Sequence, residues 1–209
     1  MVRAATRPPR THPVALRDRA AARLVHHKRE LRPGNRKANH RVASKKTIRR
    51  FRRYGDIAWR YRKRVTGHFR GTTDEILQWG AYKWGFAPDL FRAVATLESW
   101  WKVSVVGDHG QSFGLMQVKR GKHCCYPATR LSTAFNVDYY GAWLRTVYDG
   151  KLGWLRTMPK GRPYRRGDLW GSVGTWYSGR WHRGNAWYYH RVQRIIRKHV
   201  WRRSGFKHG

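Results

Sequence analysis

The sequence predicts an α+β protein that is mainly helical, with a small irregular or β excursion in its C-terminal part and a basic N-terminal extension ahead of it. Segments with helix caps and apolar residues at helical spacing succeed one another after residue 70. A glycine-containing stretch at 102–130 interrupts them. Of the 12 tryptophans, all but Trp59 lie after residue 70, so the hydrophobic core is expected there.

Three parts are expected along the chain. Residues 1–45 are rich in arginine, histidine and proline and carry too little apolar surface to offset the entropy lost on ordering. We therefore expect a basic, largely disordered tail, with a short basic helix at 15–31 as its one ordered element. Residues 46–70 carry apolar side chains at approximately helical spacing and predict a basic helical segment that can dock on the domain. The domain itself is expected at 71–203.

Two helices are expected at the start of this domain. Thr72 and Glu75 have the spacing of a capping box, and Gly85 ends the apolar pattern that follows. A second helix begins at Pro88 and Asp89, because proline costs no hydrogen bond there and the acid complements the helix dipole. Its apolar residues recur at helical spacing: Leu90, Phe91, Val94, Leu97 and Trp101.

The later elements follow from caps and breakers. Residues 102–130 predict turns with short strands. Ser132 can cap a third helix, and 148–167 form a basic connection. Asp168 caps a short helix. Asn185 opens a last helix, whose apolar residues are Val192, Ile195, Ile196 and Val200.

The charge balance is extreme and indicates a polyanionic partner. The chain holds 46 Lys and Arg residues against 11 Asp and Glu residues, a formal net charge of +35. The partner could be nucleic acid, a membrane surface or an anionic cell wall. No apolar run near Met1 is long enough for a signal-peptide core, and no segment is long enough to span a membrane. The export route therefore stays open.

Cysteine and metal chemistry are not expected to contribute. Cys124 and Cys125 are neighbours, and neighbouring cysteines can join only through a strained ring. Free thiols are therefore the expected state. No second pair of ligands supports a metal site, and no cofactor is expected.

Glu98 is the strongest candidate for acid chemistry. It lies four residues after Val94 and three before Trp101, at the edge of the apolar stripe. Apolar surroundings raise the pKa of a carboxyl group, and glycoside cleavage needs a carboxyl that is still protonated near neutral pH. The other glutamates are Glu30 in the tail and Glu75 in an exposed cap. Most helical glutamates are only solvated charges, so helical position alone does not decide.

The residues that follow Glu98 carry a resemblance to a known family. Glu98-Ser99, followed by Gly107-Asp108-His109-Gly110-Gln111-Ser112-Phe113-Gly114-Leu115-Met116-Gln117-Val118, resembles the lytic transglycosylase and goose-type lysozyme superfamily. Further matches come in the same order across about residues 72 to 200: Asn136-Val137, Gly141, Leu144, Trp176-Tyr177-Ser178-Gly179, Tyr188 and Val192. The resemblance implies a lysozyme-like catalytic domain that cleaves peptidoglycan glycan strands.

The resemblance also implies roles for single residues. Glu98 corresponds to the acid/base glutamate, and Tyr188 to a tyrosine that approaches its carboxyl group. Ser99 would support the helix end, and Tyr177 stands where the family usually has an asparagine. The substrate-binding residues that the resemblance implies are Ser99, Met116, Gln117, Tyr177 and Tyr188.

The outcome of the reaction depends on a second carboxylate that could activate water. The goose-type branch has two aspartates assigned to this task. Asp108 matches one of them, and Lys119 stands at the position of the other. With Glu98 as the sole acid/base, the C6 hydroxyl of N-acetylmuramic acid would attack the anomeric carbon and leave a 1,6-anhydro end. We expect this lytic route, with a hydrolytic lysozyme that uses Asp108 as the alternative.

Two other function classes stay open beside the enzyme. A nucleic-acid-binding protein would suit the charge of +35, if only through nonspecific contacts. An inactive wall-binding module would keep the fold without the reaction. The ordered motifs and the intact Glu98 favour an enzyme, expected to be a monomer that acts at the cell wall or outside the cell. Its basic tail would bind anionic wall polymers.

Aromatic side chains could form a platform for sugar rings. A tryptophan in a small helical domain is more often part of the core than of a ligand site. We expect one or two of four candidates to reach the groove: Trp100, Trp176, Trp181 and Trp187. His109 and His123 are interpreted as turn residues.

Overall fold

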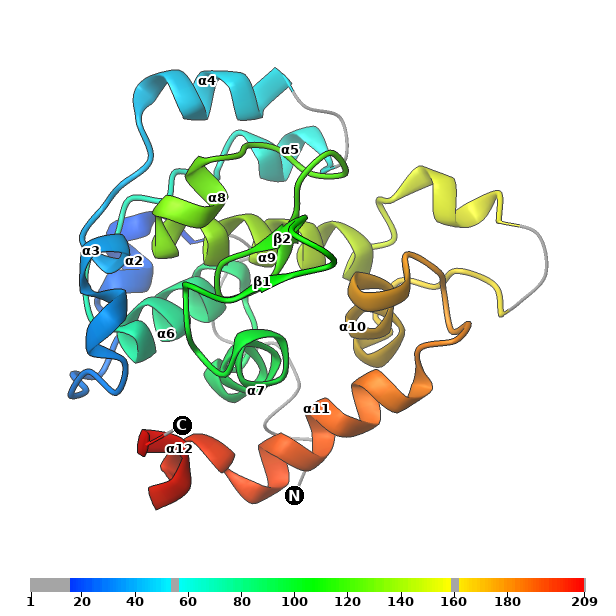
Figure 1. Ribbon diagram of the computed structural model, residues 1–209. Coiled ribbons are helices and arrows are strands. Elements are labelled where there is room, and N and C mark those ends of the chain that lie inside the picture. Colours follow the sequence, from blue (N-terminus) through cyan, green and yellow to red (C-terminus); the bar gives the residue numbers. More distant parts are fainter. Residues whose placement is uncertain (1–15, 54–56, 159–161, 209) are drawn as a thin grey trace.

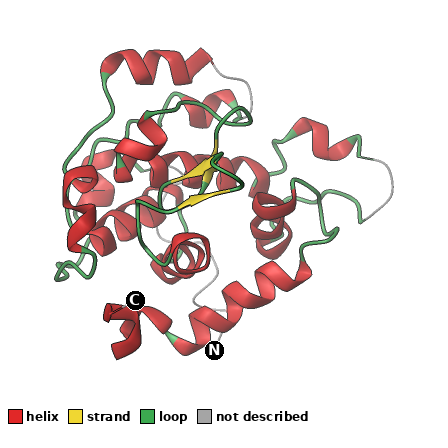
Figure 2. Ribbon diagram, in the orientation of Figure 1, coloured by secondary structure: helices red, strands yellow, loops and turns green. Residues whose placement is uncertain are grey.

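The structure is a computed structural model that describes residues 16–53, 57–158 and 162–208. It is mainly helical, with a small three-stranded antiparallel sheet, which confirms the predicted class. Figures 1 and 2 show helices arranged around α9 (Thr133–Tyr148), with the sheet beside it. No helix within the described ranges is long and apolar enough to cross a membrane.

The first two helices of the domain are α6 (Thr73–Trp84) and α7 (Pro88–Ser99). The capping box is present, since the Thr72 side chain accepts from the Glu75 amide and the Glu75 carboxylate accepts from the Thr72 amide at 2.8 Å. Gly85 ends α6 in the left-handed region at φ 73°. Glu75 is buried rather than exposed, because His27 and the Lys28 amide also bind its carboxylate.

Helix α9 is the centre of the fold. Fifteen of its 16 residues are buried, because α6, α8 (Ala128–Leu131) and α10 (Leu169–Ser178) all pack on it. Gly141 permits close packing, since a Cβ atom there would lie 2.2 Å from Cδ1 of Trp84. The same helix buries Asp138, whose carboxylate accepts from Lys83 Nζ and from Trp84 Nε1, both at 2.8 Å.

The predicted excursion contains three two-residue strands in the order β1-β2-β3. They are β1 (Val106–Gly107), β2 (Ser112–Phe113) and β3 (Val118–Lys119). Phe113 in the middle strand pairs with Val106 on one side and Val118 on the other.

The C-terminal helices differ from expectation in detail. Asp168 caps α10 as predicted, accepting from the Gly171 amide at 2.8 Å. Asn185 precedes α11 (Ala186–Lys198) but does not cap it. Its side-chain amide instead donates to Ser178 Oγ and the Arg180 carbonyl. Three more short helices complete the C-terminal half: η2 (Gly153–Arg156), η3 (Val200–Arg202) and α12 (Ser204–His208).

The N-terminal segment is folded from residue 16 onward, so the expectation of a disordered tail over 1–45 is wrong for 16–45. Its helices are α2 (Asp18–Ala22), η1 (Pro33–Asn35) and α3 (Arg36–Asn39), and no helix continues to 31. The prediction counted apolar surface, whereas much of the attachment is polar. Glu30 accepts from the Thr73 amide at 2.7 Å and from Asn39 Nδ2 at 2.8 Å. Residues 1–15 lie outside the described residues.

The basic segment expected at 46–70 contains two short helices, α4 (Lys45–Arg53) and α5 (Trp59–Arg62). Phe51 fixes α4 to the domain. Its ring is fully buried, with ring centroids 5.8 Å from Phe135 and 5.4 Å from Tyr139 of α9.

The domain continues beyond 203, the expected boundary. Phe206 in α12 is buried against the rings of Trp100 and Trp101, at centroid distances of 4.8 and 5.2 Å.

Cys124 and Cys125 are joined in a disulfide, so the expectation of free thiols is wrong. The peptide bond between them is cis, and their Cα atoms lie 3.1 Å apart. Both side chains are buried.

Candidate active site

A groove of about 910 Å³ runs between the small sheet and helix α10, with Glu98 among its lining residues. Glycine and polar side chains from the β1–β3 region form one wall, and aromatic side chains from α9, η2 and α10 form much of the other. The first group is Gly107, Asp108, Ser112, Gln117 and Lys119, and the aromatic group is Trp143, Trp154, Trp176 and Tyr177.

Glu98 lies in the last turn of α7, half-buried at the groove. Its pKa is raised to about 7, first by burial and further by the charge of Asp108, while a hydrogen bond from Tyr188 lowers it. Removal from water disfavours the carboxylate, and the carbonyl end of a helix disfavours an anion as well. Glu98 is thus poised to exchange a proton near neutral pH.

Tyr188 reaches Glu98 from α11, and its hydroxyl donates to Glu98 Oε1. The phenol is buried, and its pKa is raised well above the usual value by burial and by the Glu98 charge. It therefore stays protonated and acts only as a donor. Tyr177 stacks on the Tyr188 ring at 5.1 Å with an interplanar angle of 14°. The Tyr177 side chain is half exposed and lines the groove.

Ser99 holds the end of α7 against the turn between β2 and β3. Its hydroxyl is within hydrogen-bond distance of the Leu115 carbonyl at 2.9 Å and of the Ala95 carbonyl at 3.1 Å. Ser99 is buried, so it supports the site and does not face the groove. Asn136 of α9 holds the same turn, because its Oδ1 accepts from the Met116 amide at 2.9 Å.

Met116 and Gln117 occupy different surroundings. Met116 is fully buried and does not line the groove, so its expected contact with the sugar is not supported. Its carbonyl instead accepts from Trp176 Nε1 at 3.1 Å. Gln117 lines the groove, and its amide nitrogen donates to the carbonyls of Val105 and Gly114. Most of its donor capacity is therefore used within the protein.

Asp108 lies at the exposed rim of the groove, paired with Lys119. Its carboxylate accepts from Ser112 Oγ at 2.8 Å and from Lys119 Nζ at 3.1 Å. The Ser112 hydrogen bond and the Lys119 contact lower the pKa of Asp108. The result is a stabilised carboxylate and therefore a weak base.

Of the four tryptophans considered from the sequence, Trp176 lines the groove. Trp181 is buried in the core, and Trp100 and Trp187 are exposed outside the groove lining. Sequence reasoning missed Trp154, which is 46% exposed at the groove. It lies in a short 3-10 helix whose position no local pattern indicates.

Three more residues at the site were not assigned from the sequence. His123, expected as a turn residue, stacks on Trp176 at 5.2 Å with an interplanar angle of 13°, and it lines the groove with Lys122. Tyr140 of α9 is fully buried, and its pKa is raised well above the usual value by burial and by the charge of Glu98. Its helical periodicity indicated a core residue and gave no sign of a neighbouring carboxyl.

Within the described residues, no group of three or more His, Cys, Asp or Glu side chains is placed to hold a metal ion. Comparison with known proteins adds no relative: no family model, no curated protein and no solved structure matches this chain.

Proposed function

We propose that this chain is a peptidoglycan-cleaving enzyme with a lysozyme-like domain. It would cut the β-1,4 bond between N-acetylmuramic acid and N-acetylglucosamine by the lytic route. The observation that carries the proposal is a single carboxyl, Glu98, with a pKa of about 7 in an aromatic-lined groove. Such a group can give a proton and take one back near neutral pH. The motifs around Glu98 supply the substrate class.

In the proposed mechanism Glu98 protonates the glycosidic oxygen while the bond from that oxygen to the anomeric carbon breaks. The N-acetylglucosamine part leaves as an alcohol. The Glu98 carboxylate then removes the proton of the C6 hydroxyl on the same muramic acid residue, and that oxygen bonds to the anomeric carbon. A 1,6-anhydro ring forms, Glu98 regains its proton, and no water is consumed. Tyr188 stabilises the carboxylate between the two steps.

The lytic route is favoured over hydrolysis by the surroundings of Asp108. Ser112 and Lys119 stabilise its carboxylate, and a carboxylate of lowered pKa removes a proton from water poorly. A hydrolytic lysozyme is the second candidate, because Asp108 lines the same groove as Glu98.

Digestion of purified peptidoglycan, followed by mass spectrometry of the released muropeptides, tests the proposal. The natural sequence is expected to give mainly 1,6-anhydro ends, which are lighter than reducing ends by one water. Glu98→Gln keeps the shape of the side chain but cannot donate the proton, so we expect a rate loss of about two to four orders of magnitude. Asp108→Asn is expected to keep most of the activity.

Each other outcome points to a different function. Near-normal activity of Glu98→Gln would remove this residue from the mechanism. Reducing ends, together with an inactive Asp108→Asn variant, would indicate a hydrolytic lysozyme. Wall binding without any released muropeptide would indicate an inactive wall-binding module. Binding to nucleic acid, with neither wall binding nor cleavage, would indicate a nucleic-acid-binding protein. The enzyme is proposed to act as a monomer at the cell wall or outside the cell, where peptidoglycan lies.

A further inference from the structure

Helix α4 carries a dense set of cations that the proposed reaction does not use. Six of its nine residues are Lys or Arg, and none is Asp or Glu. Its inner side is fixed to α9 through Phe51. Figure 1 shows α4 at the outer edge of the molecule, on the side away from α11.

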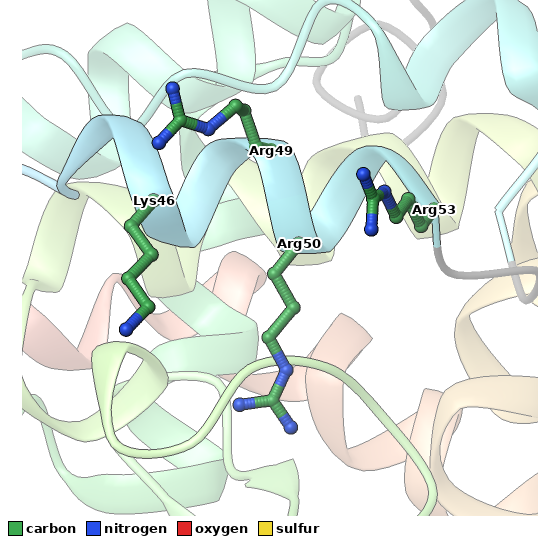
Figure 3. A pocket seen from close by; sticks show the side chains of 4 residues that line it. All are labelled: Lys46, Arg49, Arg50 and Arg53. Carbon is green, nitrogen blue, oxygen red and sulfur yellow. The ribbon is translucent and has the colours of Figure 1, made fainter.

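Four of these cations form a row along the exposed side of α4. Lys46, Arg49, Arg50 and Arg53 are spaced as i, i+3, i+4 and i+7, which places them on one helix face over about 10 Å. All four are exposed and line a hollow of about 370 Å³. In Figure 3 their side chains spread apart, with Lys46 and Arg50 extending to one side of the helix and Arg49 to the other.

The charge of this row is not neutralised by the part of the chain that the structure describes, where no carboxylate forms an ion pair with any of the four. Among the described residues that line the neighbouring hollow, of about 440 Å³, one is an acid, Asp18. Its carboxylate is engaged by Lys83 at 2.7 Å. Like charges at this spacing destabilise a helix, so the folded domain holds α4 in place against its own repulsion. An external anion would relieve that repulsion.

We infer that the row of Lys46, Arg49, Arg50 and Arg53 binds a linear phosphodiester polymer of the cell wall. The choice of a wall polymer rests on the proposed function. Guanidinium groups bind phosphate oxygens through paired hydrogen bonds, and a row of cations suits a chain of phosphates better than a single ion. Attachment at α4 would keep the groove close to the glycan strands of the same wall. The effective concentration of glycan at the groove would therefore rise.

Nucleic acid carries the same phosphates but fits the row less well. Proteins that bind single strands commonly stack bases on aromatic side chains. The only aromatic residue of α4 is Phe51, which is buried.

Binding to insoluble wall tests the inference, with Glu98→Gln as the parent so that the wall is not digested. The test variant adds Lys46→Gln, Arg49→Gln, Arg50→Gln and Arg53→Gln. The matched control removes four exposed cations from α11 instead: Arg191→Gln, Arg194→Gln, Arg197→Gln and Lys198→Gln. A third variant, with Arg49→Lys, Arg50→Lys and Arg53→Lys, keeps the charge. Sacculi that carry phosphodiester polymers are compared with the same sacculi stripped of them.

Loss of four phosphate contacts should lower the slope of log affinity against log salt by about 3, taking 0.7 per contact for a flexible chain. Between 50 and 200 mM salt, the affinity of the parent should therefore fall by about 50-fold more than the affinity of the α4 variant. The α11 control should change the slope by less than about 1, and the lysine variant should retain most of the binding. On stripped sacculi, the parent and the α4 variant should bind with similar affinity.

Equal losses in the α4 and α11 variants would overturn the inference, because net charge alone would then explain binding. So would a parent that binds stripped and intact sacculi alike, or one whose α4-dependent binding is stronger on a duplex oligonucleotide than on the wall. Cleavage is compared between the natural sequence and the same sequence with the four α4 substitutions, both of which keep Glu98. On stripped peptidoglycan the two proteins are expected to cleave at the same rate. No cleavage by either would end the proposed function without changing the binding comparison.

Discussion

At the scale of single residues, the Glu98 carboxyl is subject to opposing influences. Burial and Asp108 raise its pKa to about 7, whereas the Tyr188 hydrogen bond lowers it. Because the proposed first step needs the protonated carboxyl, activity should fall as the pH rises through about 7. Tyr188 therefore helps to set the alkaline limb of the pH profile.

Tyr188→Phe should move that limb to higher pH. The substitution keeps the ring and removes the donor, so the pKa of Glu98 rises further and the protonated form persists to higher pH. The maximal rate should fall by about tenfold or more, since a hydrogen bond to a charged group contributes about 1.5 kcal/mol or more. The pH dependence of kcat/KM measures both effects.

Tyr177→Phe is the control for this experiment, because Tyr177 stacks on Tyr188 without bonding to Glu98. Its alkaline limb should stay in place. An unmoved or lowered limb in Tyr188→Phe would contradict the assigned role of the phenol.

Predictability at this scale depends on whether a residue belongs to a local motif. Glu98 and Tyr188 lie in the ordered matches, and the structure brings them together although they are 90 residues apart. Trp154 and Tyr140 reach the site through the packing of distant segments, which no local pattern encodes. Met116 belongs to a matched motif, yet its side chain is buried, so motif membership did not fix its direction.

At the scale of elements, local signals predicted α6, α7 and α10, whose starts rest on caps or on proline within a few residues. They did not predict η1 and α3, which are held by contacts from far along the chain. Asn35 Nδ2 donates to the Trp101 carbonyl at 2.7 Å, and Asn35 Oδ1 accepts from the Val103 amide at 3.0 Å. An asparagine in a basic segment gives no sequence sign of such a role.

Asn35→Ala should lower the free energy of unfolding by about 1–3 kcal/mol, because it leaves buried backbone groups without partners. Chemical denaturation of the pure protein measures this change. Lys37→Ala, at an exposed position in α3, is the control and should stay within about 0.5 kcal/mol of the natural sequence. Equal stability of the two variants would show that the Asn35 contacts contribute little.

At the scale of the whole molecule, the N-terminal segment is part of the domain it was expected to flank. Lys83 is buried between two carboxylates, Asp138 of α9 at 2.8 Å and Asp18 of α2 at 2.7 Å. Glu30 reaches the start of α6 through Thr73. A prediction based on apolar surface could not find these attachments, since ion pairs and hydrogen bonds carry them.

Deletion of residues 1–44 should therefore destabilise the protein, whereas a disordered tail could be removed at little cost. The deletion removes the partly exposed Asp18 and leaves the buried ammonium group of Lys83 with Asp138 alone. We therefore expect a cost below the roughly 3–5 kcal/mol of breaking a fully buried pair, to which the lost contacts of Glu30 and Asn35 add. Differential scanning calorimetry measures the result. Deletion of residues 1–15 keeps every contact described here and is the control. An unchanged melting temperature in the longer deletion would show that 16–44 contribute nothing to stability.

Phe206 links the order of synthesis to the support of helix α7. Its ring covers Trp100 and Trp101, which directly follow α7, and the Arg32 guanidinium lies 4.2 Å above it. Ribosomes build the chain from its N-terminus, and residue 206 is added 174 residues after Arg32. Until then the two indole rings lack this cover. The residues that end the helix bearing Glu98 are therefore covered only after residue 206 has been added.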